Sequence, residues 1–240
     1  MATFLFVHGA WHGGWCWKAL EAQLRAAGHE THAPTLTGLG ERAHLAHAVI
    51  DADSHVEDIL AVIKWRELDD IVLVGHSYGG LIITGVAGRT PEKIKALVYL
   101  DAFVPVESGR SLFADANPER FAGFEAQLSG GGFLISPDYF DAWTDDLAKK
   151  AWLKTMRTPN PVECFRKGVT LTGREAEVTN RHYILAARNK PSALWAQFDR
   201  VRMQPGWTAD QIATKHDAMV ENPVGLAAKL GEYVGGLREK

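Results

Sequence analysis

The sequence predicts an α/β fold, in which a mostly parallel sheet carries helices on both faces and an inserted helical cap lies over the sheet. Short apolar runs alternate with segments of helical spacing over residues 4–100. This alternation is typical of β-α units whose strands pair in parallel. It stops after residue 103, and a strand pattern returns at residues 183–187, so a separate segment interrupts the sheet.

The first β-α unit lies at the N-terminus. Residues 4–7 (Phe-Leu-Phe-Val) form a compact apolar strand. Apolar residues then recur at helical spacing from Trp17 to Leu24, and Gly28 stands where a glycine would end that helix. Residues 29–36 are expected to be the next extended segment.

Two further units follow. Residues 54–57 (Ser-His-Val-Glu) match a capping box, and an apolar helix face continues from there to Ile63. Residues 71–74 (Ile-Val-Leu-Val) and 96–100 are continuous apolar runs, typical of strands buried on both faces of a parallel sheet. Between them, residues 81–87 fit a buried helix.

The chain therefore divides into a core of residues 1–103 and 179–240 and a helical cap of residues 104–178. The cap carries glycine clusters, prolines and many aromatic residues: Phe113, Phe121, Phe124, Phe133, Tyr139, Phe140, Trp143 and Trp152. After it we expect a strand at 183–187, a helix from about Pro191, a strand at 208–214 and a helix at 223–237.

The composition excludes several classes of protein. The chain has 240 residues, of which 46% are hydrophobic and 23% charged, as in ordinary globular domains. A formal net charge of −3 favours neither nucleic acid nor an anionic membrane as partner. Two cysteines, Cys16 and Cys164, make no disulfide framework and suggest a reducing compartment. With no visible targeting segment or membrane span, a cytoplasmic protein is expected, and a homodimer is one assembly that the sequence allows.

A candidate nucleophile follows the strand at 71–74. Residues 75–79 read Gly-His-Ser-Tyr-Gly and precede a predicted helix. This is the nucleophile-elbow pattern, in which a sharp strand-to-helix turn presents the serine at the carboxyl edge of the sheet. The flanking glycines leave room for strand and helix to approach each other. The pattern therefore predicts Ser77 as a nucleophile, while an idle serine in a glycine-rich turn is the alternative.

A serine hydroxyl needs a base to take its proton. In this architecture the base comes late in the chain. His216 lies after the last predicted strand and before the last helix, whereas the other nine of the ten histidines lie earlier. We therefore expect His216 to be the general base.

The tetrahedral intermediate of acyl transfer needs hydrogen-bond donors for its oxyanion. One is expected from the backbone N–H of Tyr78, which follows the serine. The other is expected from the glycine-rich loop of residues 8–15, where Gly9 permits a turn that points the N–H of Ala10 inward. Tight aromatic packing is an additional role for that loop.

These segments together resemble the bacterial carboxylesterase and pyrethroid-hydrolase group of α/β-hydrolases, itself similar to plant methyl-salicylate esterases and hydroxynitrile lyases. The resemblance runs over nearly the whole chain and rests on five segments in order: residues 8–15, 34–42, 75–80, 99–105 and 216–219. It implies the α/β-hydrolase fold, Ser77 as nucleophile, His216 as base, and Ala10 and Tyr78 as oxyanion donors.

The sequence departs from that group in two ways. The lyases carry a lysine just after the catalytic histidine and a threonine in the first loop, where this chain has Asp217 and Gly9. This difference favours ester hydrolysis over cyanohydrin cleavage. The relatives also carry their triad aspartate at the position that holds Asn189 here.

An amide cannot stabilise an imidazolium as a carboxylate does, and the corresponding change in a serine protease costs about ten-thousand-fold in rate. Asp101 is the best substitute, because it ends the strand at 96–100, beside the nucleophile strand and at the same sheet edge. Some haloalkane dehalogenases take their acid from this position. A structural aspartate that binds loop amides is the alternative.

We therefore expect a serine esterase that cleaves a small, largely apolar carboxylic ester through an acyl-enzyme on Ser77, without a metal or organic cofactor. The aromatic cap suggests an apolar pocket, although these side chains also suit a packed cap core. Three alternatives stay open: a hydroxynitrile-lyase-like or carbon–carbon-cleaving enzyme, a ligand receptor without turnover, and a binding protein with a chance elbow.

Overall fold

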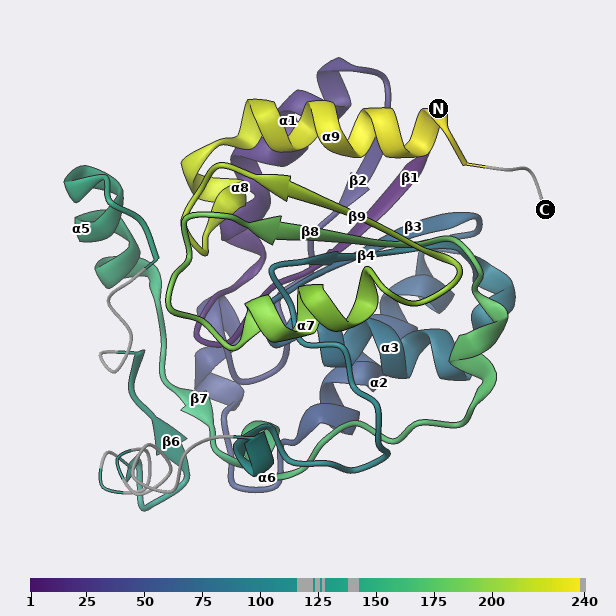
Figure 1. Ribbon diagram of the computed structural model, residues 1–240. Coiled ribbons are helices and arrows are strands. Elements are labelled where there is room, and N and C mark those ends of the chain that lie inside the picture. The colour runs from purple at the N-terminus through teal and green to yellow at the C-terminus, as the bar shows by residue number, and fades with distance from the viewer. Residues whose placement is uncertain (116–122, 124–125, 127, 138–142, 238–240) are drawn as a thin grey trace.

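The computed structural model describes residues 1–115, 123, 126, 128–137 and 143–237 (Figure 1). Its centre is a six-stranded sheet in the order β2-β1-β3-β4-β8-β9, with every neighbouring pair parallel. The strands are β1 (Thr3–Val7), β2 (Glu30–His32), β3 (Ile71–His76), β4 (Ile94–Leu100), β8 (Arg181–Ala186) and β9 (Trp207–Ile212). The predicted parallel sheet is confirmed.

Helices cover both faces of the sheet, as predicted (Figure 1). One face carries α1 (Lys18–Ala26), α8 (Ala218–Glu221) and α9 (Pro223–Gly235), and the other carries α2 (Ala52–Trp65), α3 (Gly79–Arg89) and α7 (Leu194–Val201). Alternate residues of a strand point to opposite faces. Accordingly Phe4 and Phe6 pack with α1 and α9, whereas Leu5 and Val7 pack with α2 and α3.

Short 3-10 helices connect several of these elements: η1 (Gly14–Trp17), η2 (Gly40–Leu45), η3 (Pro91–Lys93), η4 (Leu112–Asp115) and η6 (Arg174–Glu177). Gly28, the predicted end of the first helix, has a φ of +85°, the left-handed conformation that suits a glycine after a helix.

The segment between β4 and β8 contains more than helices. Besides α5 (Leu147–Met156) and α6 (Glu163–Arg166), its described part forms a small antiparallel sheet of β5 (Leu128–Ser129), β6 (Leu134–Ile135) and β7 (Asn160–Pro161). The boundaries at 104 and 178 stay a prediction. Four of the cap aromatics lie outside the described residues: Phe121, Phe124, Tyr139 and Phe140.

The capping prediction for α2 was wrong by one turn. The helix begins at Ala52, and Asp51 accepts a hydrogen bond from the Ser54 N–H at 3.0 Å while the Ser54 hydroxyl faces the Asp51 N–H at 3.3 Å. Asp51 caps the helix three residues before Ser54 in the sequence, because its carboxylate accepts a hydrogen bond from the backbone N–H of Ser54 in the first turn. The extended segment 29–36 is also shorter than predicted, since pairing in β2 stops at His32, before Pro34.

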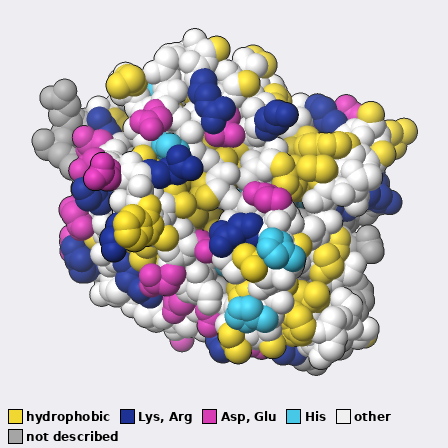
Figure 2. All heavy atoms as spheres, turned by 180° about the vertical axis from the view of Figure 1, so that it is seen from behind, with side chains coloured by type: hydrophobic (Ala, Val, Ile, Leu, Met, Phe, Trp, Pro, Cys, Tyr) yellow, Lys and Arg dark blue, Asp and Glu magenta, His cyan; other side chains and the backbone are white. Residues whose placement is uncertain are grey.

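Three further features concern the surface charge, the helices and the cysteines. The rear face mixes acidic, basic and apolar side chains, so neither sign of charge dominates it (Figure 2). None of the described helices is long and apolar enough to cross a membrane. Cys16 and Cys164 are both buried and carry free thiols.

Candidate active site

Ser77 occupies the turn between β3 and α3. Its φ is +54°, a left-handed conformation that is strained for a serine. The turn is held because the Ser77 N–H donates to the Leu100 carbonyl at 3.3 Å, and the Ser77 carbonyl accepts from the Phe103 N–H at 3.1 Å. A Cβ on Gly75 would lie 2.6 Å from the Gly79 carbonyl oxygen, so the glycine is needed for the close approach of strand and helix.

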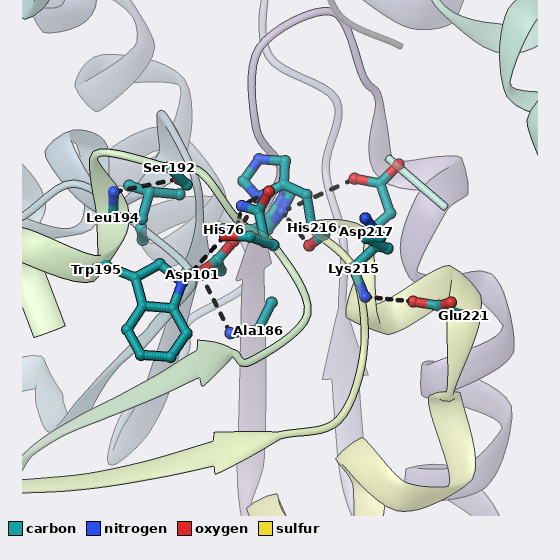
Figure 3. A network of polar contacts seen from close by, with 12 residues as sticks. His76, Asp101, Ala186, Ser192, Leu194, Trp195, Lys215, His216, Asp217 and Glu221 are labelled. Carbon is teal, nitrogen blue, oxygen red and sulfur yellow. Dashed lines mark hydrogen bonds and ion pairs between the residues drawn. The ribbon is translucent and has the colours of Figure 1, made fainter. Parts of the chain in front are cut away.

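His216 lies on the loop between β9 and α8, and Asp101 directly follows β4. The His216 Nδ1 donates to Asp101 Oδ2 at 2.6 Å (Figure 3). Asp101 is fully buried and also accepts from the Ala186 N–H at 3.2 Å. Burial disfavours the His216 imidazolium, but the hydrogen bond and charge of Asp101, with the charge of Asp217, outweigh it and raise the pKa of His216.

Asn189 follows β8 and joins this pair. Its Nδ2 donates to Asp101 Oδ2 at 2.7 Å and lies 3.3 Å from the His216 Nδ1. The two positions from which the triad acid could come, the ends of β4 and β8, therefore converge on the same imidazole nitrogen. Asn189 contributes a donor that orients the carboxylate of Asp101.

The loop after β1 lies against the serine. A Cβ on Gly9 would come within 2.9 Å of the Ser77 Cβ, so this glycine serves close approach. The left-handed residue of the loop is Trp11, with a φ of +64°. Within the described part of the chain, the backbone N–H groups of Ala10 and Tyr78 donate to no acceptor, which leaves both available to a ligand oxygen.

The structure does not bring every predicted residue into contact. No hydrogen bond joins the Ser77 side chain to His216 in the described structure. Ser77 is half-buried, and its neighbour His76 has its ring 4.4 Å from the His216 ring, so serine and histidine lie at the same sheet edge. Catalytic hydrogen bonds are often long before substrate binds.

Comparison with known proteins identifies the family of the chain. A model described as "Alpha/beta hydrolase family" matches residues 4–229. The chain belongs to this family. This α/β hydrolase is 41% identical over 239 residues to a carbendazim hydrolyzing esterase of Nocardioides sp. (strain SG-4G), across 96% of this chain and 98% of the relative.

Plant relatives match shorter stretches. Methylesterase 10 of Arabidopsis thaliana is 37% identical over 177 residues, covering 63% of this chain and 64% of the plant protein. An alpha-hydroxynitrile lyase of the same plant is 38% identical over 103 residues, 42% of this chain and 40% of its own. With such relatives, the protein is a carboxylesterase-type α/β hydrolase.

Solved structures agree on the fold. An extracellular α/β-hydrolase from a Paenibacillus species superposes with a TM-score of 0.85 at 21% identity, covering 97% of this chain and 99% of that one. A pyrethroid hydrolase, PytH, superposes with a TM-score of 0.74 at 21% identity over 98% of both chains.

Trp143, on the segment between β4 and β8, packs on His216, and the sequence did not predict that this ring lies at the site. Its ring centroid lies 5.3 Å from that of His216 and 5.2 Å from that of His12. The guanidinium of Arg157 lies 5.2 Å from the Trp143 ring. The only signal for Trp143 in the sequence was the abundance of aromatic residues in the predicted cap. That abundance does not distinguish a ring that contacts the site from a ring in the core of the cap.

Three buried polar side chains behind His216 were also missed. His12, His76 and Asp217 are fully buried. His76, His216 and Asp217 have ligand atoms within 4.8 Å of one another, close enough for a metal. However, His216 Nδ1 is bonded to Asp101 and His76 Nε2 donates to the His216 carbonyl at 3.1 Å. Two nitrogen atoms of the group therefore already have protein partners, and we assign no metal to it.

Proposed function

We propose that this α/β hydrolase is a serine esterase that cleaves a small, largely apolar carboxylic ester through an acyl-enzyme on Ser77. The observation that carries the proposal is the contact between His216 and Asp101 at the sheet edge where Ser77 stands in its strained turn. A buried carboxylate on the Nδ1 of an imidazole fixes the tautomer whose Nε2 can take a proton. Family membership and the esterase relatives support the same assignment.

In the first step, the Ser77 hydroxyl attacks the ester carbonyl while His216 Nε2 takes the hydroxyl proton. The negative charge that develops on the carbonyl oxygen is stabilised by the N–H groups of Ala10 and Tyr78. Asp101 stabilises the imidazolium that forms on His216. Collapse of the intermediate expels the alcohol, which leaves with the proton from His216.

In the second step, His216 takes a proton from water, and the resulting hydroxide attacks the acyl-enzyme. The same oxyanion donors serve again, and the proton returns to Ser77 as the acid departs. Each step needs the imidazole in its neutral form at the outset. The Asp101 contact raises the pKa of His216 and therefore makes the base stronger.

An apolar substrate is supported by the aromatic side chains around the site. Trp11 packs on Phe165 with ring centroids 5.4 Å apart, and Tyr78 packs on the same phenylalanine at 6.0 Å. Phe113 stacks on it with ring centroids 5.7 Å apart. These rings make the surroundings of the site apolar, which favours apolar acyl or alcohol groups.

The test is covalent labelling by a fluorophosphonate probe, together with turnover of short-chain nitrophenyl esters and of carbendazim. We expect labelling and ester turnover by the wild type and neither by Ser77→Ala. Cleavage of a cyanohydrin by a protein inert toward esters would replace this proposal with the lyase alternative. A wild type that binds ligands but is neither labelled nor active would replace it with the receptor alternative.

A further inference from the structure

Behind His216 lies a second buried histidine–carboxylate contact. His12 Nε2 lies 3.2 Å from Asp217 Oδ2, and both side chains are fully buried. His12 belongs to the loop of the proposed oxyanion donor Ala10, and Asp217 follows His216 directly. In Figure 3, the side chains of Asp101 and Asp217 lie on either side of His216.

The geometry of this contact needs one proton more than a neutral His12 and an ionised Asp217 would supply. His12 Nδ1 lies 2.7 Å from the Ala10 carbonyl oxygen, which can only accept, so this nitrogen carries a proton. A neutral imidazole has one N–H, and its Nε2 would then present a lone pair to a carboxylate that also has only lone pairs. The observed distance therefore requires one more proton between Nε2 and Oδ2.

The surroundings of Asp217 favour the same state. Among the described residues, its Oδ1 has no hydrogen-bond partner, and His76 Nε2 lies 3.9 Å from it. A buried carboxylate without compensation is strongly disfavoured. Burial, and next the charge of Asp217, raise the pKa of Cys16, which stays a thiol.

Other nearby histidines do not supply that charge. Burial lowers the pKa of His76 well below its usual range and lowers that of His8 to about 3, so both are neutral. On the other side, the Nδ1–H of His216 donates its hydrogen bond to Asp101. His12 is the histidine in hydrogen-bond contact with Asp217, at 3.2 Å, and is therefore placed to share the compensating proton.

The same pair spans two functional loops. His12 Nδ1 donates a hydrogen bond to the Ala10 carbonyl, just before Trp11 with its positive φ. Asp217 is the next residue after His216. The Asp217 N–H also donates to the Trp143 carbonyl at 3.1 Å, and the Trp143 ring packs on both His12 and His216. A displacement of the Ala10 loop would therefore also displace the His216 loop.

We infer that His12 and Asp217 form a buried, proton-sharing pair that holds the oxyanion loop in register with the His216 loop. Both are positioning residues, and their role rests on the esterase function proposed above. This pair is separate from the contact of His216 with Asp101, because it uses a different histidine and a different carboxylate.

The shared proton is tested by NMR of protein with 15N-labelled histidine rings. We expect two far-downfield ring protons, one for His216–Asp101 and one for His12–Asp217. Asp217→Asn should abolish only the second, because its amide can donate to a neutral His12 in the same geometry. Asp101→Asn should abolish only the first. A single signal that disappears in Asp101→Asn and persists in Asp217→Asn would overturn the inference.

The positioning role is tested by kinetics per active site, titrated with the fluorophosphonate so that misfolded protein does not count. For Asp217→Ala we expect kcat to fall about ten- to a hundredfold with KM changed less than threefold, since misplacement by about 1 Å costs this much. Asp217→Asn keeps the contact and should lose less than Asp217→Ala. Equal kcat in wild type and Asp217→Ala would refute the role.

Asp210→Asn is the matched control, because Asp210 lies on the edge strand β9 and pairs with Lys229 of α9. It should leave kcat unchanged. Failure of this inference differs from failure of the proposed function: an inactive, unlabelled wild type refutes the esterase, whereas an active wild type with an unaffected Asp217→Ala refutes only the pair.

Discussion

Replacement of Asp101 by Asn tests the assignment of the triad acid most directly. Asn keeps the shape of the side chain but removes the charge that stabilises the His216 imidazolium. It also allows an amide N–H to face His216 Nδ1, which favours the wrong tautomer. The 2.6 Å contact and full burial of Asp101 place this site in the regime of buried serine-protease triads. We therefore expect kcat/KM to fall about ten-thousand-fold, or about 5 kcal/mol of transition-state stabilisation.

The double variant Asp101→Asn with Asn189→Asp moves the carboxylate to the end of β8. The Asn189 amide nitrogen is 3.3 Å from His216 Nδ1, so a carboxylate oxygen placed there can accept its proton. We expect recovery of about ten- to a hundredfold over Asp101→Asn alone, limited by imperfect geometry. Asn189→Ala removes one of three donors to Asp101 and should cost less than about tenfold.

The assay is hydrolysis of a nitrophenyl ester, with labelling by the fluorophosphonate as a second readout and circular dichroism as a check on folding. The reasoning is refuted if folded Asp101→Asn keeps more than a tenth of the wild-type kcat/KM. A large loss in Asn189→Ala with a small one in Asp101→Asn would move the decisive role to the β8 position.

Three further predictions concern pH, the elbow and the α2 cap. Because the pKa of His216 in the folded protein is raised above 6.5, kcat/KM should rise with pH through a midpoint above 6.5. The stability that the protonated imidazole contributes should be fully present below the pKa of the unfolded state and should be lost as pH rises through the pKa of the folded state. A pH–rate profile and thermal melts across this pH range check both predictions. Gly75→Ala places a Cβ 2.6 Å from the Gly79 carbonyl oxygen and should cost about 1–3 kcal/mol of unfolding free energy in urea melts, and an unchanged midpoint would contradict the packing. Asp51→Ala should lower the free energy of unfolding by about 1 kcal/mol in the same measurement. A far larger loss of unfolding free energy in Ser54→Ala would show that Ser54, and not Asp51, is the N-cap.

The sheet and the residues that follow its strands were predictable because both depend on local patterns. A run such as Ile71 to Val74 is apolar on both faces only where both faces are covered, and the glycine-flanked serine after it suits one kind of turn. Asp101 could be proposed because parallel strands end at one edge, so the residue after β4 lies near the residue after β3.

The contacts that the sequence did not predict join distant positions without a repeating pattern. His12 and Asp217 are 205 positions apart in the sequence. A histidine and an aspartate at these two positions could equally well be exposed, so the sequence does not indicate a buried pair. The small strands β5 to β7 have two residues each, too short for an alternation to be recognised. The α2 cap was misplaced because Asp51 and Ser54 both suit an N-cap, and packing decides between them.

The backbone conformation at the site links these observations. Trp11, Ser77 and Asp101 have positive φ and follow β1, β3 and β4, which are neighbours in the sheet. Such a conformation costs about 1–3 kcal/mol per residue and persists only where surrounding contacts enforce it. Here each backbone N–H donates to a residue on a strand: Trp11 N–H to Asn160 of β7, Ser77 N–H to the Leu100 carbonyl of β4, and Asp101 N–H to the Ile184 carbonyl of β8. These three residues belong to the proposed oxyanion loop, nucleophile and acid, so the parallel register of the sheet would set the geometry of all three at once.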